Sequence, residues 1–134
     1  SISWLLDATL GSDLNDCFHG RTAGEVVRRK KPAPGIYQHA LDRVAVEPAA
    51  VIVIEDAEAG LQAALSAGLT VVVTISEFTH EHDFCGAAAV VDQLGDPGLP
   101  CLQLNGCVEL QPMVTLENLE RLLTTTMRRQ PHGT

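Results

Sequence analysis

Aromatic side chains are scarce in this sequence: Trp, Tyr and Phe make up 4% of its 134 residues, whereas hydrophobic residues as a whole make up 46%. The core must therefore be built mainly from Val, Ala, Leu and Ile, which suit the strands and covering helices of a parallel sheet. A chain of this length fits one compact domain.

Basic residues are also few. Nine Lys and Arg stand against seventeen Asp and Glu, which gives a formal net charge of -8. Because nucleic-acid backbones are bound by positive surfaces, we expect no nucleic-acid partner. Small phosphorylated molecules remain candidates, since local charge decides their binding.

Long apolar runs and cysteine pairs are missing too. The longest runs, such as residues 69–75, are too short to cross a bilayer, so we expect no membrane partner. The four cysteines form no Cys-x-x-Cys pair, and no signal peptide is evident, which favours a reducing, cytoplasmic setting. The chain begins with Ser1 rather than Met and enters helix-like periodicity almost at once, so we expect it to be part of a longer protein.

Hydrophobic periodicity divides the chain into alternating helices and strands. We predict helices over residues 2–10, 36–46 and 61–68 and from Thr115 onward, and strands over 17–23, 51–54, 71–73 and 88–91. The last of these strands is expected at an edge of the sheet. The remaining segments are predicted to be a polar loop (77–86), an irregular stretch (95–112) and a disordered tail (128–134) after a domain over 1–127.

Thr115 is expected to cap the final helix, with Leu116, Leu119 and Leu123 facing inward. Upstream, the strand–helix–strand pattern over 51–73 is typical of a right-handed parallel βαβ unit. The predicted fold class is therefore α/β, with helices on both faces of a parallel sheet in three layers.

Two adjacent acids, Glu55 and Asp56, directly follow the apolar strand over 51–54. Ligands of open α/β sheets bind beyond the carboxyl ends of the strands. Neighbouring carboxylates repel each other unless a cation compensates, and hard oxygen ligands suit Mg²⁺. Acids at the start of a helix are also stabilised by its dipole, so a purely helix-stabilising role stays open on this pattern alone.

Lys31 lies in a loop made rigid by Pro32 and Pro34, before the helix that leads into the acidic strand. That helix and strand could return the two acids to the same end of the sheet as Lys31. An ammonium beside a metal site neutralises the charge of a phosphoryl group in transit. The pattern therefore indicates phosphate chemistry.

Two segments together resemble the haloacid-dehalogenase-type (HAD) hydrolases. Lys30-Lys31-Pro-Ala-Pro-Gly-Ile-Tyr resembles the third motif of that family, in which a lysine precedes Pro-x-Pro. Residues 51–68 resemble its fourth motif: an apolar strand, Glu-Asp, then Gly and an Ala-rich helix that ends in Ala-Gly. Residues 73–79, followed by Asp83 and Phe84, are similar to the CbbY-type branch, which is close to the β-phosphoglucomutase-like group.

The resemblance implies a Rossmann-like, HAD-like core that transfers phosphoryl groups through an aspartyl-phosphate with Mg²⁺ as cofactor. By the match, Asp56 would be a direct Mg²⁺ ligand, and Glu55 would bind the metal through water or hold its hydration shell. Lys31 would be the catalytic lysine, which pairs with the nucleophile and a phosphoryl oxygen, and Gly60 would allow close packing at the helix start. The CbbY-type branch dephosphorylates small sugar phosphates, including xylulose 1,5-bisphosphate, which implies the chloroplast stroma as the location in a plant or alga.

The sequence also departs from the family. The first motif, Asp-x-Asp-Gly-Thr, which supplies the nucleophile, is absent. Asp7-Ala-Thr-Leu-Gly resembles it only superficially, and we interpret Asp7 as a solvent-facing helix residue. The second motif and the cap are missing, and Gly35 stands where the family usually has an acid. We therefore expect the C-terminal part of the HAD-like core, without its first strand and cap domain, and no turnover by this chain alone.

Other interpretations remain open at this stage. His80, His82 and Cys85 could bind zinc with Cys101 or Cys107, although this is not a strong ligand spacing and a polar loop with one buried thiol fits better. The two motifs do not separate a phosphatase from a phosphomutase. A non-catalytic α/β domain that binds a metal or a partner is a further alternative, and the oligomeric state is open.

Overall fold

A computed structural model describes residues 27–129 of the chain. The predicted helix over 2–10, the predicted strand over 17–23 and Asp7 lie outside this range. The predicted tail began at residue 128, but Arg128 and Arg129 belong to the last helix.

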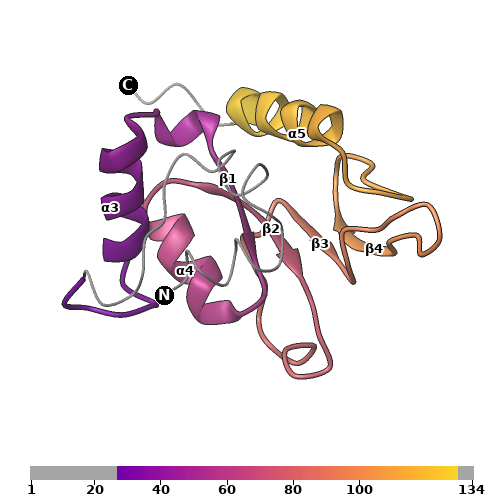
Figure 1. Cartoon of the computed structure of the whole chain (residues 1–134), viewed down its shortest axis with the longest axis horizontal. Coiled ribbons are helices and arrows are strands. Elements are labelled where there is room, and N and C mark those ends of the chain that lie inside the picture. Colours follow the sequence, from indigo (N-terminus) through magenta and orange to yellow (C-terminus); the bar gives the residue numbers. More distant parts are fainter. Residues whose placement is uncertain (1–26, 130–134) are drawn as a thin grey trace, which may run out of the picture.

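Helices and strands alternate over residues 35–74, and two further strands then precede the last helix (Figure 1). In chain order they are α3 (Gly35–Val44), the short 3-10 helix η2 (Pro48–Ala50), β1 (Ile52–Glu55), α4 (Glu58–Ser66), β2 (Thr70–Thr74), β3 (Ala89–Val91), β4 (Gln103–Gly106) and α5 (Leu116–Arg129). The predictions for α3, β1, α4, β2 and β3 are confirmed, each within three residues at either end.

The four strands form one sheet in the order β1-β2-β3-β4. The first three strands run parallel, with Glu55 of β1 beside Val73 of β2, so the predicted βαβ unit and the α/β class are confirmed. The β4 strand pairs antiparallel to β3, which makes the sheet mixed.

The predicted edge position of residues 88–91 is wrong, because β4 lies beyond β3, and residues 95–112 are not wholly irregular. The sequence of β4, Gln-Leu-Asn-Gly, has neither β-branched residues nor strict alternation, so periodicity could not reveal it. The strand pairs with β3 through the backbone, and side chains add further contacts. The amide of Gln103 donates to the backbone carbonyl of Val108 (2.9 Å), and the backbone N–H of Gln103 donates to the side chain of Gln111 (2.9 Å).

Alternate residues of β2 face two separate cores, which confirms the three layers. Val71 and Val73 pack with Leu61 and Ala64 of α4, and α3 covers the margin of this cluster. Val72 faces the other way and packs with Leu122 of α5. A central strand that buries both faces is typical of a sheet with helices on either side.

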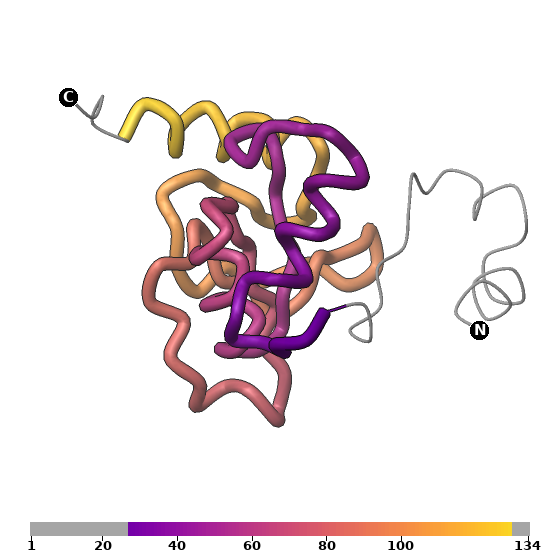
Figure 2. The backbone as a smooth tube through the Cα atoms, turned by 90° about the vertical axis from the view of Figure 1, so that its left-hand side faces the viewer, coloured from indigo at the N-terminus to yellow at the C-terminus, as the bar shows by residue number. Residues whose placement is uncertain are grey.

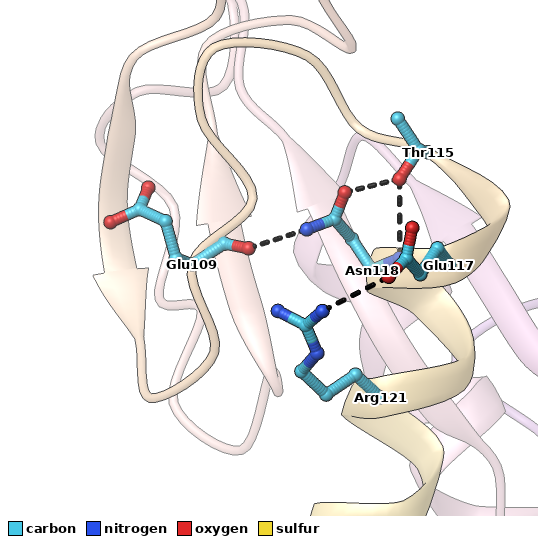
Figure 3. Close-up of polar contacts among 5 residues, drawn as sticks. All are labelled: Glu109, Thr115, Glu117, Asn118 and Arg121. Atoms are coloured by element: carbon cyan, nitrogen blue, oxygen red, sulfur yellow. Dashed lines mark hydrogen bonds and ion pairs between the residues drawn. The ribbon is translucent and has the colours of Figure 1, made fainter.

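The last helix is capped as predicted by Thr115, whose hydroxyl accepts a hydrogen bond from the backbone N–H of Asn118 (3.2 Å; Figure 3). The side chain of Asn118 in turn donates to the Glu109 carbonyl (2.8 Å), and Glu117 pairs with Arg121 (3.3 Å). These contacts fix the helix end against the loop that follows β4.

The predicted inward face of α5 is partly wrong. Leu119 packs against the core as expected, but Leu116 is 79% exposed and Leu123 is only partly buried. The fully buried residue is Leu122, at 1% exposure. Because Thr115 is the N-cap, Leu116 takes the first helical position and points away from the sheet, so the buried face runs through positions 119 and 122.

The parallel strands β1 and β2 end at the lower rim of the molecule in Figure 1. The segment before α3, the first turn of α4 and the loop after β2 lie at this rim in both views, whereas α5 lies at the opposite end (Figures 1 and 2). Within residues 27–129, no helix combines the length and the apolar character needed to cross a membrane.

Candidate functional site

The carboxyl end of β1 carries the two predicted acids in different environments. Glu55 is the last residue of the strand and is only 8% exposed, whereas Asp56 is exposed to solvent. A buried carboxylate is costly unless it is paired and hydrogen-bonded. The partners of Glu55 therefore define the site.

Lys31 supplies the charge that Glu55 needs: its ammonium forms an ion pair with Oε1 of Glu55. The two residues are 24 positions apart in the sequence. Their meeting confirms the prediction that α3 and β1 return the acids to the end of the sheet where Lys31 lies. The lysine side chain remains 38% exposed, so its ammonium is open to solvent on one side.

Tyr37, in the first turns of α3, is a site residue that sequence reasoning missed. Its hydroxyl donates a hydrogen bond to the same oxygen of Glu55. Burial, and after it the Glu55 carboxylate, raise the pKa of Tyr37 well above its ordinary value, so the phenol stays protonated and acts as a donor. The available signal was that the only tyrosine of the chain lies four positions before Leu41, on the inward face of the predicted helix.

Gly60 closes the other side of the Glu55 carboxylate. It is buried in the first turn of α4, and a β-carbon at this position would overlap the carboxylate. The expected role of Gly60 in close packing at the helix start is therefore confirmed.

Neither acid caps α4. Its N-cap is Ala57, which makes no side-chain hydrogen bond, and the helix begins at Glu58. The loop after β2 supplies the contacts instead. The ring Nδ1 of His82 accepts from the backbone N–H of Glu58 (3.3 Å), and the Glu58 carboxylate accepts from the backbone N–H of Asp83 (3.4 Å). Glu55 and Asp56 therefore do not cap α4 through a side chain, while Asp56 still lies next to the N-terminus of the helix, where the dipole favours a negative charge.

The predicted zinc alternative involved His80, His82 and Cys85. Among residues 27–129, no three His, Cys, Asp or Glu side chains gather closely enough to hold a metal ion. Cys85 is exposed, so the expectation of a buried thiol in this loop is wrong, and among the cysteines in residues 27–129 the buried one is Cys101.

The described residues offer Mg²⁺ a partial set of ligands. Mg²⁺ in phosphate-handling sites is usually held by one or two carboxylates, with water and substrate phosphate completing its shell. The exposed carboxylate of Asp56 fits that role. Glu55 is engaged by Lys31 and Tyr37 at Oε1, so it fits a position behind the metal rather than a direct ligand.

Comparisons with known proteins show which family the chain resembles. The model of the haloacid dehalogenase-like hydrolases matches residues 2–68. The chain is 48% identical over 75 residues to a CBBY-like protein of Arabidopsis thaliana. These matched residues make up 56% of this chain and 24% of that protein. The chain is 42% identical over 87 residues to the CbbY protein of Rhodobacter capsulatus, which covers 65% of this chain and 38% of the relative.

The fold is similar to crystal structures of CbbY from Rhodobacter sphaeroides. One, a complex with phosphate, has a TM-score of 0.63 at 35% identity and covers 69% of this chain and 41% of that one. A second, a mutant in complex with xylulose 1,5-bisphosphate, has a TM-score of 0.64 at 34% identity. This match covers 72% of this chain and 44% of the mutant's chain. The chain thus spans well under half the length of these relatives. With half of its residues matched by the family model, the chain belongs to the haloacid dehalogenase-like hydrolases.

Proposed function

We propose that these residues belong to a Mg²⁺-dependent phosphatase that acts on a small sugar phosphate such as xylulose 1,5-bisphosphate. One observation carries the proposal: the Lys31–Glu55 ion pair at the carboxyl end of β1, beside the exposed Asp56. The complexes of Rhodobacter sphaeroides CbbY with phosphate and with this sugar support the choice of substrate class.

Each residue has a separate task in this proposal. The Lys31 ammonium, open to solvent on one side, stabilises the negative charge that spreads over the phosphoryl oxygens during transfer. Glu55 holds this ammonium at the rim and would take part in metal binding only through water, since its carboxylate is buried and engaged by Lys31 and Tyr37. Asp56 binds Mg²⁺ directly. Bound Mg²⁺ supplies charge neutralisation of the phosphate and helps to orient it.

The nucleophile is not among these residues. The family reaction passes through an aspartyl-phosphate, and the 134 residues contain no Asp-x-Asp-Gly-Thr segment. We therefore expect a protein of only these residues to bind at most the phosphate end of a substrate, without turnover. The free state of the three described cysteines fits a reducing compartment, the cytoplasm or, in a plant or alga, the chloroplast stroma.

A chimera tests the proposal. The 87-residue segment of Rhodobacter capsulatus CbbY that matches this chain is replaced by the matching segment of this chain. We expect the folded chimera to release phosphate from xylulose 1,5-bisphosphate in Mg²⁺, and the 134-residue chain alone to release none. Rearrangement of a sugar monophosphate without phosphate release would instead indicate a phosphomutase. A folded chimera that binds Mg²⁺ but transforms neither substrate would favour the non-catalytic binding domain.

A further inference from the structure

Tyr37 contacts both members of the Lys31–Glu55 ion pair at once. Its hydroxyl donates to Oε1 of Glu55, and the Lys31 ammonium lies 5.3 Å from the centroid of its ring. The body of the side chain packs against the core cluster beneath α4. Tyr37, which is anchored in the core, therefore contacts both the Glu55 carboxylate and the Lys31 ammonium that this carboxylate binds.

We propose that Tyr37 is a positioning residue that holds the Lys31 ammonium at the rim of the sheet, through the Glu55 carboxylate and through the face of its own ring. The inference deepens the proposed function, since the rim is where that function places the phosphate. The inference is about how rigidly the Lys31 side chain is held, however, and this rigidity can be measured in a protein that has no enzymatic activity.

The need for such a device follows from the chemistry of lysine. Its ammonium sits on a flexible stem of four carbons and forms point-like contacts that leave the stem mobile. Lys31 is 38% exposed, so neighbouring side chains enclose it only in part. A cation within about 6 Å of an aromatic centroid is attracted to the ring face, which adds a second, directional restraint.

The carboxylate also has to be fixed before it can orient anything. Gly60 leaves room for the Glu55 carboxylate on one side, and Lys31 and Tyr37 meet it on the other. Without the tyrosine hydroxyl, the only described partner of Glu55 would be the end of a mobile lysine. The hydroxyl therefore sets where the carboxylate lies, and the carboxylate sets where the ammonium lies.

The chain suits a direct test, because Lys30 and Lys31 are its only lysines. Lysine labelled with ¹³C at Cε gives two signals, and Lys31→Arg removes one of them and so assigns both. Relaxation of each signal yields an order parameter, in which low values report fast side-chain motion. Lys30 serves as the reference within the same molecule.

Three substitutions separate positioning from packing. Tyr37→Phe keeps the ring and removes the hydroxyl, and Tyr37→Leu removes both. Leu41→Ala is the matched control, because Leu41 lies one turn further along α3 and packs against the same core cluster but has neither a hydroxyl nor an aromatic ring. We expect the Lys31 order parameter to fall in Tyr37→Phe and further in Tyr37→Leu, with Lys30 unchanged and Leu41→Ala leaving both signals as they were.

The proposal is overturned if Tyr37→Phe leaves the Lys31 order parameter unchanged, or if Leu41→Ala lowers it as much. The unsubstituted chain gives an independent check should Tyr37→Leu fail to fold: an Lys31 order parameter as low in the folded chain as in the urea-unfolded chain would overturn the proposal by itself. Absence of phosphate release by the CbbY chimera would count against the proposed function alone, since the order parameters do not depend on it.

Discussion

The carboxylate of Glu55 lies where Gly60 would carry a β-carbon, so the last residue of β1 and the first turn of α4 fit together only because residue 60 has no side chain. This contact sets how closely α4 approaches the end of β1. It also leaves Lys31 and Tyr37 as the partners of Glu55 on the opposite side.

Gly60→Ala tests this fit, because two effects predict opposite signs. Helix propensity alone would stabilise the protein by up to about 1 kcal/mol. Overlap with the buried carboxylate should instead destabilise it by about 1–3 kcal/mol, as other overpacked sites do. Urea unfolding measures the difference, with Gln62→Ala on the exposed face of the same helix as a control expected within about 0.5 kcal/mol. A stabilised Gly60→Ala variant would disprove the packing account.

The Lys31–Glu55 pair should be visible as coupling between two substitutions. Lys31→Met leaves a buried carboxylate without its cation, and we expect a loss of about 1–2 kcal/mol in the free energy of unfolding, below the values for fully buried pairs because Lys31 is partly exposed. Glu55→Gln removes the charge that Lys31 was balancing. The double variant should therefore lose less than the sum of the two single variants, by about 1 kcal/mol.

Arg28→Met, which removes an exposed positive charge close in sequence to Lys31, is the matched control for that cycle. It should change stability little and show no coupling to Glu55→Gln. Strict additivity of Lys31→Met and Glu55→Gln would mean that the pair contributes nothing.

Much of this site could be predicted from residue pattern. The apolar strand, the acids that end it and the lysine before Pro32 each follow from local chemistry and from the direction of parallel strands. The contribution of Tyr37 could not, because its hydroxyl becomes a site atom only when α3 lies across the end of β1. A tyrosine on the inward face of a helix occupies the same sequence position whether it only packs in the core or also contacts a functional site, so the hydrophobic pattern does not distinguish the two.

The errors have a common origin in tertiary pairing. The β4 strand forms by pairing with β3 and by side-chain contacts of Gln103, and its residues have little β propensity of their own. Nothing local therefore predicts β4, and without it β3 is expected at the edge. The predicted buried face of α5 differs from the observed one because several leucines lie close together within two turns of the helix, so their spacing does not show which of them is buried. Only the cap at Thr115 and the cluster around Val72 decide that Leu122 is the one that faces the sheet.

A pair of leucine substitutions checks that face of α5. Leu122→Ala should cost about 2–4 kcal/mol, since it opens a cavity in a core where the residue is 1% exposed. Leu116→Ala, at a position that is 79% exposed, should cost less than about 0.5 kcal/mol. Thermal or urea unfolding of the two variants measures this, and equal losses would contradict the assignment of the buried face.

The cysteines should differ in reactivity towards iodoacetamide. Burial, helped by the Asp92 carboxylate, raises the pKa of Cys101, so its thiol stays protonated and shielded near neutral pH. Cys85 and Cys107 are exposed. Peptide mass spectrometry after brief labelling should show both modified well before Cys101, and the difference should disappear in urea. Fast labelling of Cys101 in the folded chain would contradict its placement.

The central claim is that the rim of Lys31, Glu55 and Asp56 handles phosphate, and Asp56→Asn in the CbbY chimera tests it most directly. The measurement is the rate of phosphate release from xylulose 1,5-bisphosphate in Mg²⁺, beside Glu58→Gln as a control for loss of a neighbouring acid. The account predicts that Asp56→Asn lowers the rate by at least about a hundredfold, comparable to the loss of one strong transition-state contact, and that Glu58→Gln lowers it little. A folded Asp56→Asn chimera that hydrolyses the sugar as fast as the unsubstituted one would contradict it.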